Sequence, residues 1–332
     1  MIWLTWRQHR REALIFAVLF GTFALYLILL GRAMYDDFYH VTNGVSVASC
    51  LWQNQNAICN NLVDVFYGGK YSINTQPALL LFLILPPLVG MFIGAPLVAR
   101  EMETGTFRLA WTQSVTRLRW LMTKVGLLAA ALALVFAAFI PLVFWWKGPF
   151  NIGGESMMIG GQDYPIMGIL PFAYTIFALA LGLAAGALLR RTIPAMVVTL
   201  GGYIGAAIAI WNWGRQNWLP PLSVTWNPYV SNGPTNWKNS DWILYQGYVD
   251  SAGQRVGFGD AVAACAAPGG NVTLEAGSPY NACIQSHGWL STVVWQPADR
   301  FWAFQGIESG VLVALALALL ALTVWLVRRR IA

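Results

Sequence analysis

Six long apolar segments dominate this 332-residue sequence, and they constrain its fold more than any other feature. The hydrocarbon core of a bilayer is about 30 Å thick, so an α-helix needs about 20 apolar residues to cross it. Only one charged residue, Glu308, falls inside these segments. We therefore predict an all-α membrane protein with six transmembrane helices. The segments are residues 13–31, 78–99, 125–146, 168–189, 195–213 and 306–327.

The overall composition agrees with this prediction. Hydrophobic residues make up 57% of the chain and charged residues only 10%, whereas soluble domains contain about 25% charged residues. A chain this apolar has too few polar groups to cover a water-exposed surface, which excludes most soluble enzyme folds. The net charge of +6 is then interpreted as a signal for membrane orientation, and no nucleic-acid partner is expected.

The positions of the basic residues predict the orientation. Of the 20 Lys and Arg residues, 13 lie in the two chain ends and in the connections 100–124 and 190–194. Cytoplasmic loops carry an excess of Lys and Arg, so both termini are expected in the cytoplasm. The segment 13–31 is too long for a secretory signal and is expected to be retained as a span. The predicted location is the plasma membrane, crossed several times.

The segment 214–305 is the largest region between spans, and we expect it outside the cell. It separates residues 1–213, which hold the first five spans, from residues 306–332, which hold the sixth span and a basic tail. It contains seven tryptophans that suit either a small core or the lipid headgroup level. Its fold is left open by the sequence.

All four cysteines lie in the regions predicted to be outside, where disulfides persist. Four cysteines allow three pairings, and closeness in sequence favours two local bridges over the others. Four unpaired thiols remain the alternative. The favoured pairs are Cys50–Cys59 and Cys265–Cys283.

The sequence contains no motif for covalent chemistry. Phosphate-binding, dinucleotide-binding, metalloprotease and serine-hydrolase patterns are absent. Three histidines, His9, His40 and His287, lie in three different regions, which makes a zinc site improbable. We expect neither enzymatic activity nor a bound cofactor or metal in this chain.

The connection 100–124, REMETGTFRLAWTQSVTRLRWLMTK, is the most informative segment. Phe107, Ala110 and Trp111 have the spacing of one apolar face of a short helix. Glu101 and Glu103 lie near its start, where the helix dipole favours negative charge. An ordinary interfacial helix on lipid headgroups has the same features, and the residues alone do not separate the two interpretations.

This segment resembles the first cytoplasmic loop of type-two ATP-binding cassette (ABC) permeases. That loop has the pattern E-x-E-x-G-T, a short leucine-rich helix, T-P-[IV]-[ST]-R and a Lys at the next span. Here Thr112-Gln113-Ser114 replaces the Thr-Pro pair. The opening Thr5–Leu14 also resembles actinobacterial members of the family. The matching residues are Glu101, Glu103, Gly105, Thr106, Leu109, Val115, Thr116, Arg117 and Lys124.

The resemblance implies that the loop forms a coupling helix, which docks on a separate ATPase that binds ATP and magnesium. It implies two ATPase copies and a second permease, either identical or related. It also implies an N-terminal interfacial anchor. The coupling residues would be Glu101, Glu103, Gly105, Thr106, Phe107, Leu109, Trp111 and Arg117, and the anchor residues Trp3, Trp6, Arg7, Arg10 and Arg11.

The function that follows is the permease subunit of an ATP-driven exporter with an unidentified, amphiphile-like substrate. Two alternatives stay open at this point. One is an ion-coupled carrier, which the nearly charge-free spans argue against. The other is a sensing or interaction subunit that uses the segment 214–305 to bind a ligand.

Overall fold

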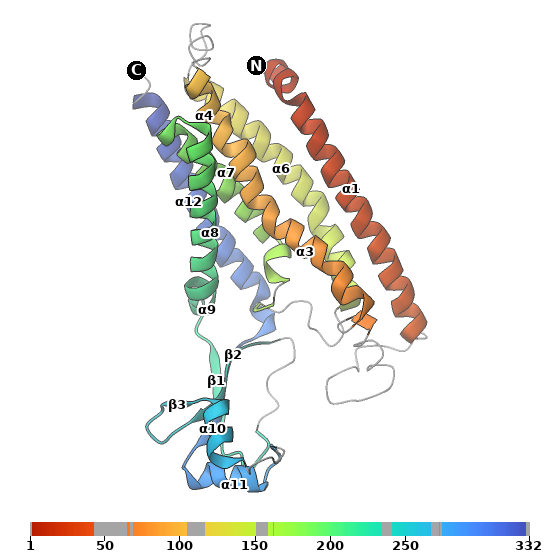
Figure 1. Ribbon diagram of the computed structural model, residues 1–332, viewed down its shortest axis with the longest axis vertical. Coiled ribbons are helices and arrows are strands. Elements are labelled where there is room, and N and C mark those ends of the chain that lie inside the picture. Colours follow the sequence, from red (N-terminus) through yellow and green to blue (C-terminus); the bar gives the residue numbers. More distant parts are fainter. Residues whose placement is uncertain are drawn as a thin grey trace. The chain divides into compact units, whose positions relative to one another are not determined.

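The chain divides into two compact units in the computed structural model (Figure 1). The helical unit comprises Met1–Ser156, Pro165–Arg215 and Gln305–Ala332, and the sheet unit comprises Met157–Tyr164 and Gln216–Phe304. The larger part of the sheet unit, Gln216–Phe304, falls within residues 214–305, and its smaller part comes from earlier in the chain. The structure describes residues 2–42, 65–66, 69–104, 117–150, 159–161, 163–233, 241–266, 272 and 274–329.

Within the described residues, six helical stretches are long and apolar enough to cross a membrane, in agreement with the predicted number. Two of them contain a π-helical turn, labelled η3 and η7, between α-helical segments. The candidate spans are Ala17–His40, Thr75–Thr104, Leu121–Lys147, Leu170–Leu189, Thr192–Asn217 and Ala298–Arg328. The helices are α1 (Ile2–Thr42), α3 (Lys70–Val89), η3 (Gly90–Gly94), α4 (Ala95–Thr104), α6 (Arg117–Lys147), α7 (Leu170–Leu189), α8 (Thr192–Ala209), η7 (Ile210–Gly214), α9 (Arg215–Asn217) and α12 (Phe301–Arg329), with short 3-10 turns at η4 (Gly148–Phe150), η6 (Tyr164–Ile166) and η8 (Ala298–Arg300).

The first helix is longer than the sequence predicted. α1 continues through the predicted anchor, the span 13–31 and the beginning of the predicted loop up to Thr42. Its later turns are stabilised by α3, because the fully buried Tyr71 donates hydrogen bonds from its hydroxyl to the carbonyl of Ala33 and to Asp37. The charged residues after position 31 suggested a loop, but they lie on a helix that packs against its neighbour.

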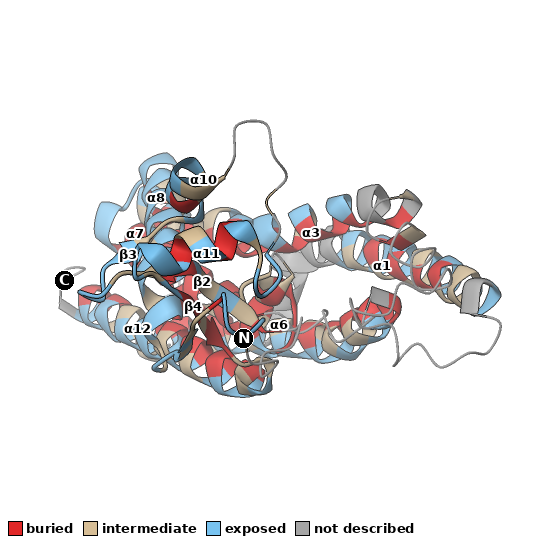
Figure 2. Ribbon diagram, turned by 90° about the horizontal axis from the view of Figure 1, so that it is seen from below, coloured by how far each residue is buried: buried red, intermediate tan, exposed pale blue. Residues whose placement is uncertain are grey.

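α7 is the central helix of the helical unit. In its most apolar stretch 72% of the residues are buried, compared with 17% in the corresponding stretches of α6 and α8. Its sequence is rich in alanine and glycine, so neighbouring backbones approach it closely. The more exposed helices present apolar faces outward, as lipid contact requires (Figure 2).

The closest helix contact in this unit joins α7 to η3 and α4. A Cβ atom on Gly90 would lie 2.6 Å from the carbonyl oxygen of Ala178, and one on Gly182 would overlap the carbonyl oxygen of Gly90. Both positions therefore require glycine. Pairs of small residues four positions apart permit this backbone contact between membrane helices.

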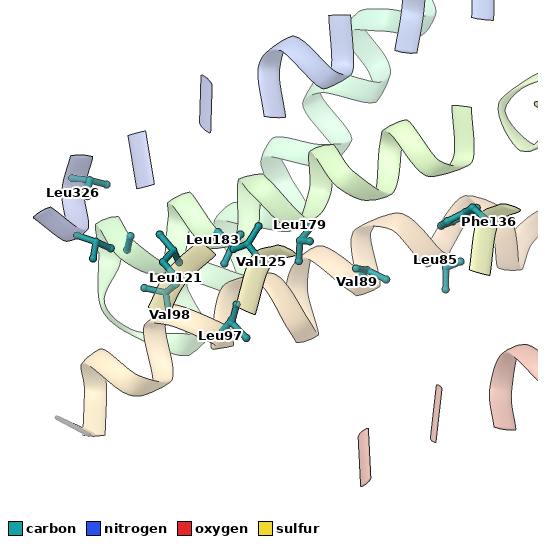
Figure 3. Close-up of a cluster of buried hydrophobic side chains, with 12 residues drawn as sticks. Leu85, Val89, Leu97, Val98, Leu121, Val125, Phe136, Leu179, Leu183 and Leu326 are labelled. Atoms are coloured by element: carbon teal, nitrogen blue, oxygen red, sulfur yellow. The ribbon is translucent and has the colours of Figure 1, made fainter. Parts of the chain in front are cut away.

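A buried hydrophobic cluster surrounds this contact (Figure 3). It draws side chains from α3, α4, α6, α7 and α12, and thereby joins five of the helices in one core. Its fully or nearly fully buried members include Val89, Val98, Leu121, Leu183 and Val327.

The sheet unit is built on a four-stranded antiparallel sheet with the order β1-β4-β2-β3. The strands are short and rich in β-branched and aromatic residues, a composition typical of strands. The expectation of an all-α fold is therefore correct for the helical unit and wrong for this segment. The elements are β1 (Leu222–Trp226), β2 (Trp242–Val249), β3 (Arg255–Val256), α10 (Phe258–Cys265), α11 (Pro279–Ser286) and β4 (Leu290–Gln296).

The two helices of the sheet unit share a small core and a disulfide. Tyr248, Ala261, Tyr280 and Ile284 are buried together between the sheet and the helices. The bond between Cys265 and Cys283 connects α10 to α11, which confirms the predicted pair. The other predicted pair, Cys50–Cys59, lies outside the described residues.

For two of the seven tryptophans in the segment 214–305, the structure distinguishes a place in a small core from a place at the headgroup level. Trp295 on β4 is 6% exposed and belongs to the interior of the sheet unit, whereas Trp302 at the start of α12 is 56% exposed. The first therefore serves a core, and the second remains available for the headgroup level.

Replacing Gly182 by alanine is expected to lower the stability of the helical unit. The added methyl group overlaps backbone atoms of the neighbouring helix, and overpacking of this kind costs about 1–3 kcal/mol. Thermal unfolding in detergent should show a lower midpoint than for Gly126→Ala on α6, where an added Cβ meets nothing within 4 Å. Equal midpoints for the two variants would contradict the close contact.

Candidate functional site

The candidate coupling loop lies between the end of α4 at Thr104 and the start of α6 at Arg117. Its two glutamates lie in α4 and are described. The side chain of Arg117 and those of the predicted anchor residues Trp3, Trp6, Arg7, Arg10 and Arg11, all on helical backbone, are outside the description. Also outside it are Gly105, Thr106, Phe107, Leu109, Trp111, Cys50 and Cys59.

Glu101 forms an ion pair with Lys124 of α6. The Lys124 side chain is only 8% exposed and the Glu101 side chain 26%. A largely buried ammonium group requires a nearby negative charge, since desolvation alone would disfavour its charged form. The pair therefore holds the last turn of α4 against the first turns of α6, on the two sides of the loop.

Glu103 binds the beginning of α8. Its Oε2 accepts hydrogen bonds from the backbone N–H of Thr192 at 3.2 Å and from the Thr192 hydroxyl at 2.8 Å. The first N–H groups of a helix have no partner within the helix, and the helix dipole favours a carboxylate there. The residue before α8, Arg191, makes no side-chain cap. A glutamate from another span thus caps this helix.

The connection between α7 and α8 is a tight turn. Arg190 has φ of 54° and donates its backbone N–H to the carbonyl of Gly186. Pro194 lies in the first turn of α8, where a missing backbone N–H costs no helical hydrogen bond. The turn places Thr192 within reach of Glu103, so α4, α7 and α8 meet at this end of the unit.

A second polar cluster lies inside the helical unit. Both carboxylate oxygens of Glu308 accept hydrogen bonds from Arg215, at 3.0 Å from Nη2 and 3.1 Å from Nε, and Oε1 also accepts one from the Tyr174 hydroxyl at 2.7 Å. Glu308 is fully buried and Arg215 is 2% exposed. The cluster joins α7, α9 and α12.

The sequence analysis missed Arg215. It ended the fifth span at 213, whereas the helical stretch continues to Asn217 and includes this arginine. Arg215 is therefore buried inside the spans together with Glu308, and the expectation of a single intramembrane charge is corrected. The signal available in the sequence was Glu308 itself, because a buried carboxylate requires a partner.

Gln305, one helical turn before Glu308, forms hydrogen bonds with backbone groups at the start of α7. Its Oε1 accepts hydrogen bonds from the backbone N–H groups of Ile169 and Leu170, and its Nε2 donates to the carbonyl of Met167. This end of α12 thus serves as a polar face toward α7.

In the sheet unit, Cys265, Cys283 and His287 lie within 4.8 Å of one another. Both sulfur atoms are bonded to each other. Zinc ligation requires thiolates, so this group does not form a metal site while the disulfide is intact.

A comparison with protein-family models assigns residues 17–215 to the family described as ABC-2 membrane transporter related. The chain belongs to this family. The match covers the first four spans and nearly all of the fifth, and it ends at Arg215, so the larger part of the sheet unit, Gln216–Phe304, and α12 lie beyond it. Searches of curated proteins and of solved structures find no match.

Membership in this family indicates the general function of the chain. The chain is a multi-pass membrane protein of the ABC-2 permease type, a transport subunit of a family whose members generally work with an ATPase partner and dimerise. This agrees with the family resemblance of the connection 100–124. The actinobacterial subtype suggested by Thr5–Leu14 stays a prediction.

Replacing Glu101 by glutamine is expected to destabilise the junction of α4 and α6. The change removes the negative charge beside the largely buried Lys124 ammonium, at a cost of about 1–3 kcal/mol. The thermal unfolding midpoint in detergent should fall, and the second change Lys124→Met should restore some of the loss. If Lys124→Met lowers the midpoint further by an independent amount, the two residues do not act as a pair.

Proposed function

We propose that this chain is the membrane-spanning subunit of an ATP-driven exporter, and that the connection 100–124 receives the movement of a separate ATPase. The observation that carries the proposal is the attachment of α4 at its end. Glu101 joins it to α6, and Glu103 joins it to α8. A displacement of the loop therefore acts on three spans together.

The path continues inward through α7. The glycine contacts of η3 and α4 with α7 leave no flexible side chains between the two backbones. Helices in direct backbone contact move together more readily than helices separated by long side chains, because packed interiors deform little. The loop is thus mechanically continuous with the most buried helix of the unit.

The proposed ATPase contact is Phe107 and Trp111, with Gly105, Thr106, Leu109 and Arg117 shaping the loop. Buried aromatic residues tend to contribute most of the binding energy of an interface. Glu101 and Glu103 act within the permease instead, since their carboxylates bind α6 and α8. Two ATPase copies and a second permease complete the proposed assembly, and ATP and magnesium are bound by the ATPase.

The proposed orientation has both termini in the cytoplasm of a bacterium and the sheet unit outside. The disulfide between Cys265 and Cys283 supports this, because such bonds persist in oxidising compartments. The excess of Lys and Arg at the chain ends and in the connections 100–124 and 190–194 supports it as well. Substrates of amphiphilic character fit the tryptophan-rich segment 214–305, in which Trp302 is exposed.

Truncating Phe107 or Trp111 to alanine is expected to weaken association with the ATPase by about 2 kcal/mol or more, if either is an interface hot spot. Co-purification of a candidate ABC ATPase that is co-expressed with this chain measures the association at matched expression. Phe92→Ala is the control, since this phenylalanine is 57% exposed on η3 within the span Thr75–Thr104. If the same amount of ATPase co-purifies with both loop variants, the loop is an ordinary interfacial helix and not the ATPase contact.

Replacing Glu103 by glutamine is expected to impair transport while ATPase recovery stays near that of the unchanged chain. The change weakens the cap of α8 but leaves the proposed aromatic contact in place. Transport-coupled ATP hydrolysis in reconstituted vesicles measures the first effect and co-purification the second. Loss of ATPase recovery with intact folding would place Glu103 in the interface and contradict its assigned role.

A further inference from the structure

The π-helical turn η7 directly precedes the buried arginine. The backbone N–H of Arg215 bonds the carbonyl of Ile210, five residues earlier, whereas α8 uses the usual spacing of four. Isolated π-turns inside α-helices are rare and occur frequently at functional sites. This one lies at the point where the fifth span supplies its charge.

The π-turn determines where Arg215 points. An α-helix turns about 100° per residue, and a π-turn contains one residue more than an α-turn. If residues 210–214 became α-helical without other change, Arg215 would rotate about 100° around the helix axis. Its guanidinium group would then leave Glu308 on α12.

The Arg215–Glu308 ion pair favours the π-form of residues 210–214 over the α-form. Arg215 binds both oxygens of Glu308, and its guanidinium carbon lies 4.6 Å from the centre of a Trp211 ring. Separating two opposite charges inside an apolar interior is strongly unfavourable, so the pair opposes any rotation that would part them. The structure has the π-turn with the pair formed, and an α-turn would carry Arg215 away from Glu308.

We propose that η7 is a register switch and that the Arg215–Glu308 pair is the latch that holds it in the π-form. With the latch formed, α7, α9 and α12 are bound together through Tyr174, Arg215 and Glu308. With the latch released, η7 becomes α-helical and α12 loses its charged contact to the fifth span. The switch is a property of the permease itself and does not rest on the proposed exporter function.

The test measures how accessible α12 is at the level of the latch. Ser309 is 7% exposed, and a thiol introduced there by Ser309→Cys should react slowly with N-ethylmaleimide in detergent. Gly310→Cys, at the exposed neighbouring position, is the matched control for the micelle environment. Mass spectrometry of the peptide containing the position gives the ratio of the two rates.

The latch is neutralised by Arg215→Gln together with Glu308→Gln. Hydrogen bonds between ionised groups are stronger than those between neutral ones, so the labelling ratio should rise about fivefold. An unchanged ratio in correctly inserted protein would show that the pair does not hold this arrangement.

Deletion of Asn212 separates a switch from a purely structural pair. The deletion makes Ile210 and Arg215 four residues apart, so a continuous α-helix keeps Arg215 in phase with Glu308. In this background, neutralising the pair should leave the labelling ratio near its original value. A fivefold rise in both backgrounds would overturn the register switch, because loosening would then not require the π-turn.

A second measurement needs no deletion and applies if the deletion variant does not fold. The rate of hydrogen–deuterium exchange in residues 210–215 should change when the latch is neutralised, because the backbone amides of this segment change hydrogen-bond partners, while the centre of α7 stays unchanged. Equal exchange in residues 210–215 before and after neutralisation would contradict the proposal, because the π-turn would then not depend on the pair.

Discussion

The backbone contact between α7 and the η3–α4 segment is the interaction on which the helical unit depends. Lipid tails are as apolar as leucine, so the hydrophobic effect does not drive helices together within a membrane. Close approach at Gly90 and Gly182 supplies packing instead. The surrounding cluster in Figure 3 and the attachments of α4 to α6 and α8 are arranged around this contact.

Buried charges provide the second constraint, because each requires a partner from another helix. Lys124 has Glu101, and Arg215 has Glu308. These two pairs lie in different regions of the helical unit and fix the relative rotation of the helices that they join, which apolar side chains alone specify poorly. In this protein the two buried ion pairs therefore lie where they set the relative rotation of the helices.

The sequence predicted the number of spans and the Cys265–Cys283 bond because both depend on local signals, namely run length and closeness in the chain. The sequence analysis missed interacting residues that are far apart in the chain and that only the folded structure brings together. Arg215 lies 93 residues from Glu308 and two positions beyond the predicted span, and hydropathy does not report such pairs. The strands β1 and β4 were missed because their pairing joins short stretches at opposite ends of the segment 214–305.

The cap that Glu103 provides to α8 has a consequence for how the protein is made. The carboxylate precedes Thr192 by 89 residues, so the ribosome completes it long before the fifth span emerges. The first turn of α8 therefore finds its hydrogen-bond acceptor already in the membrane when it arrives. The first turn of the fifth span is thus completed by a residue of the second, and the order of synthesis supplies the two in that sequence.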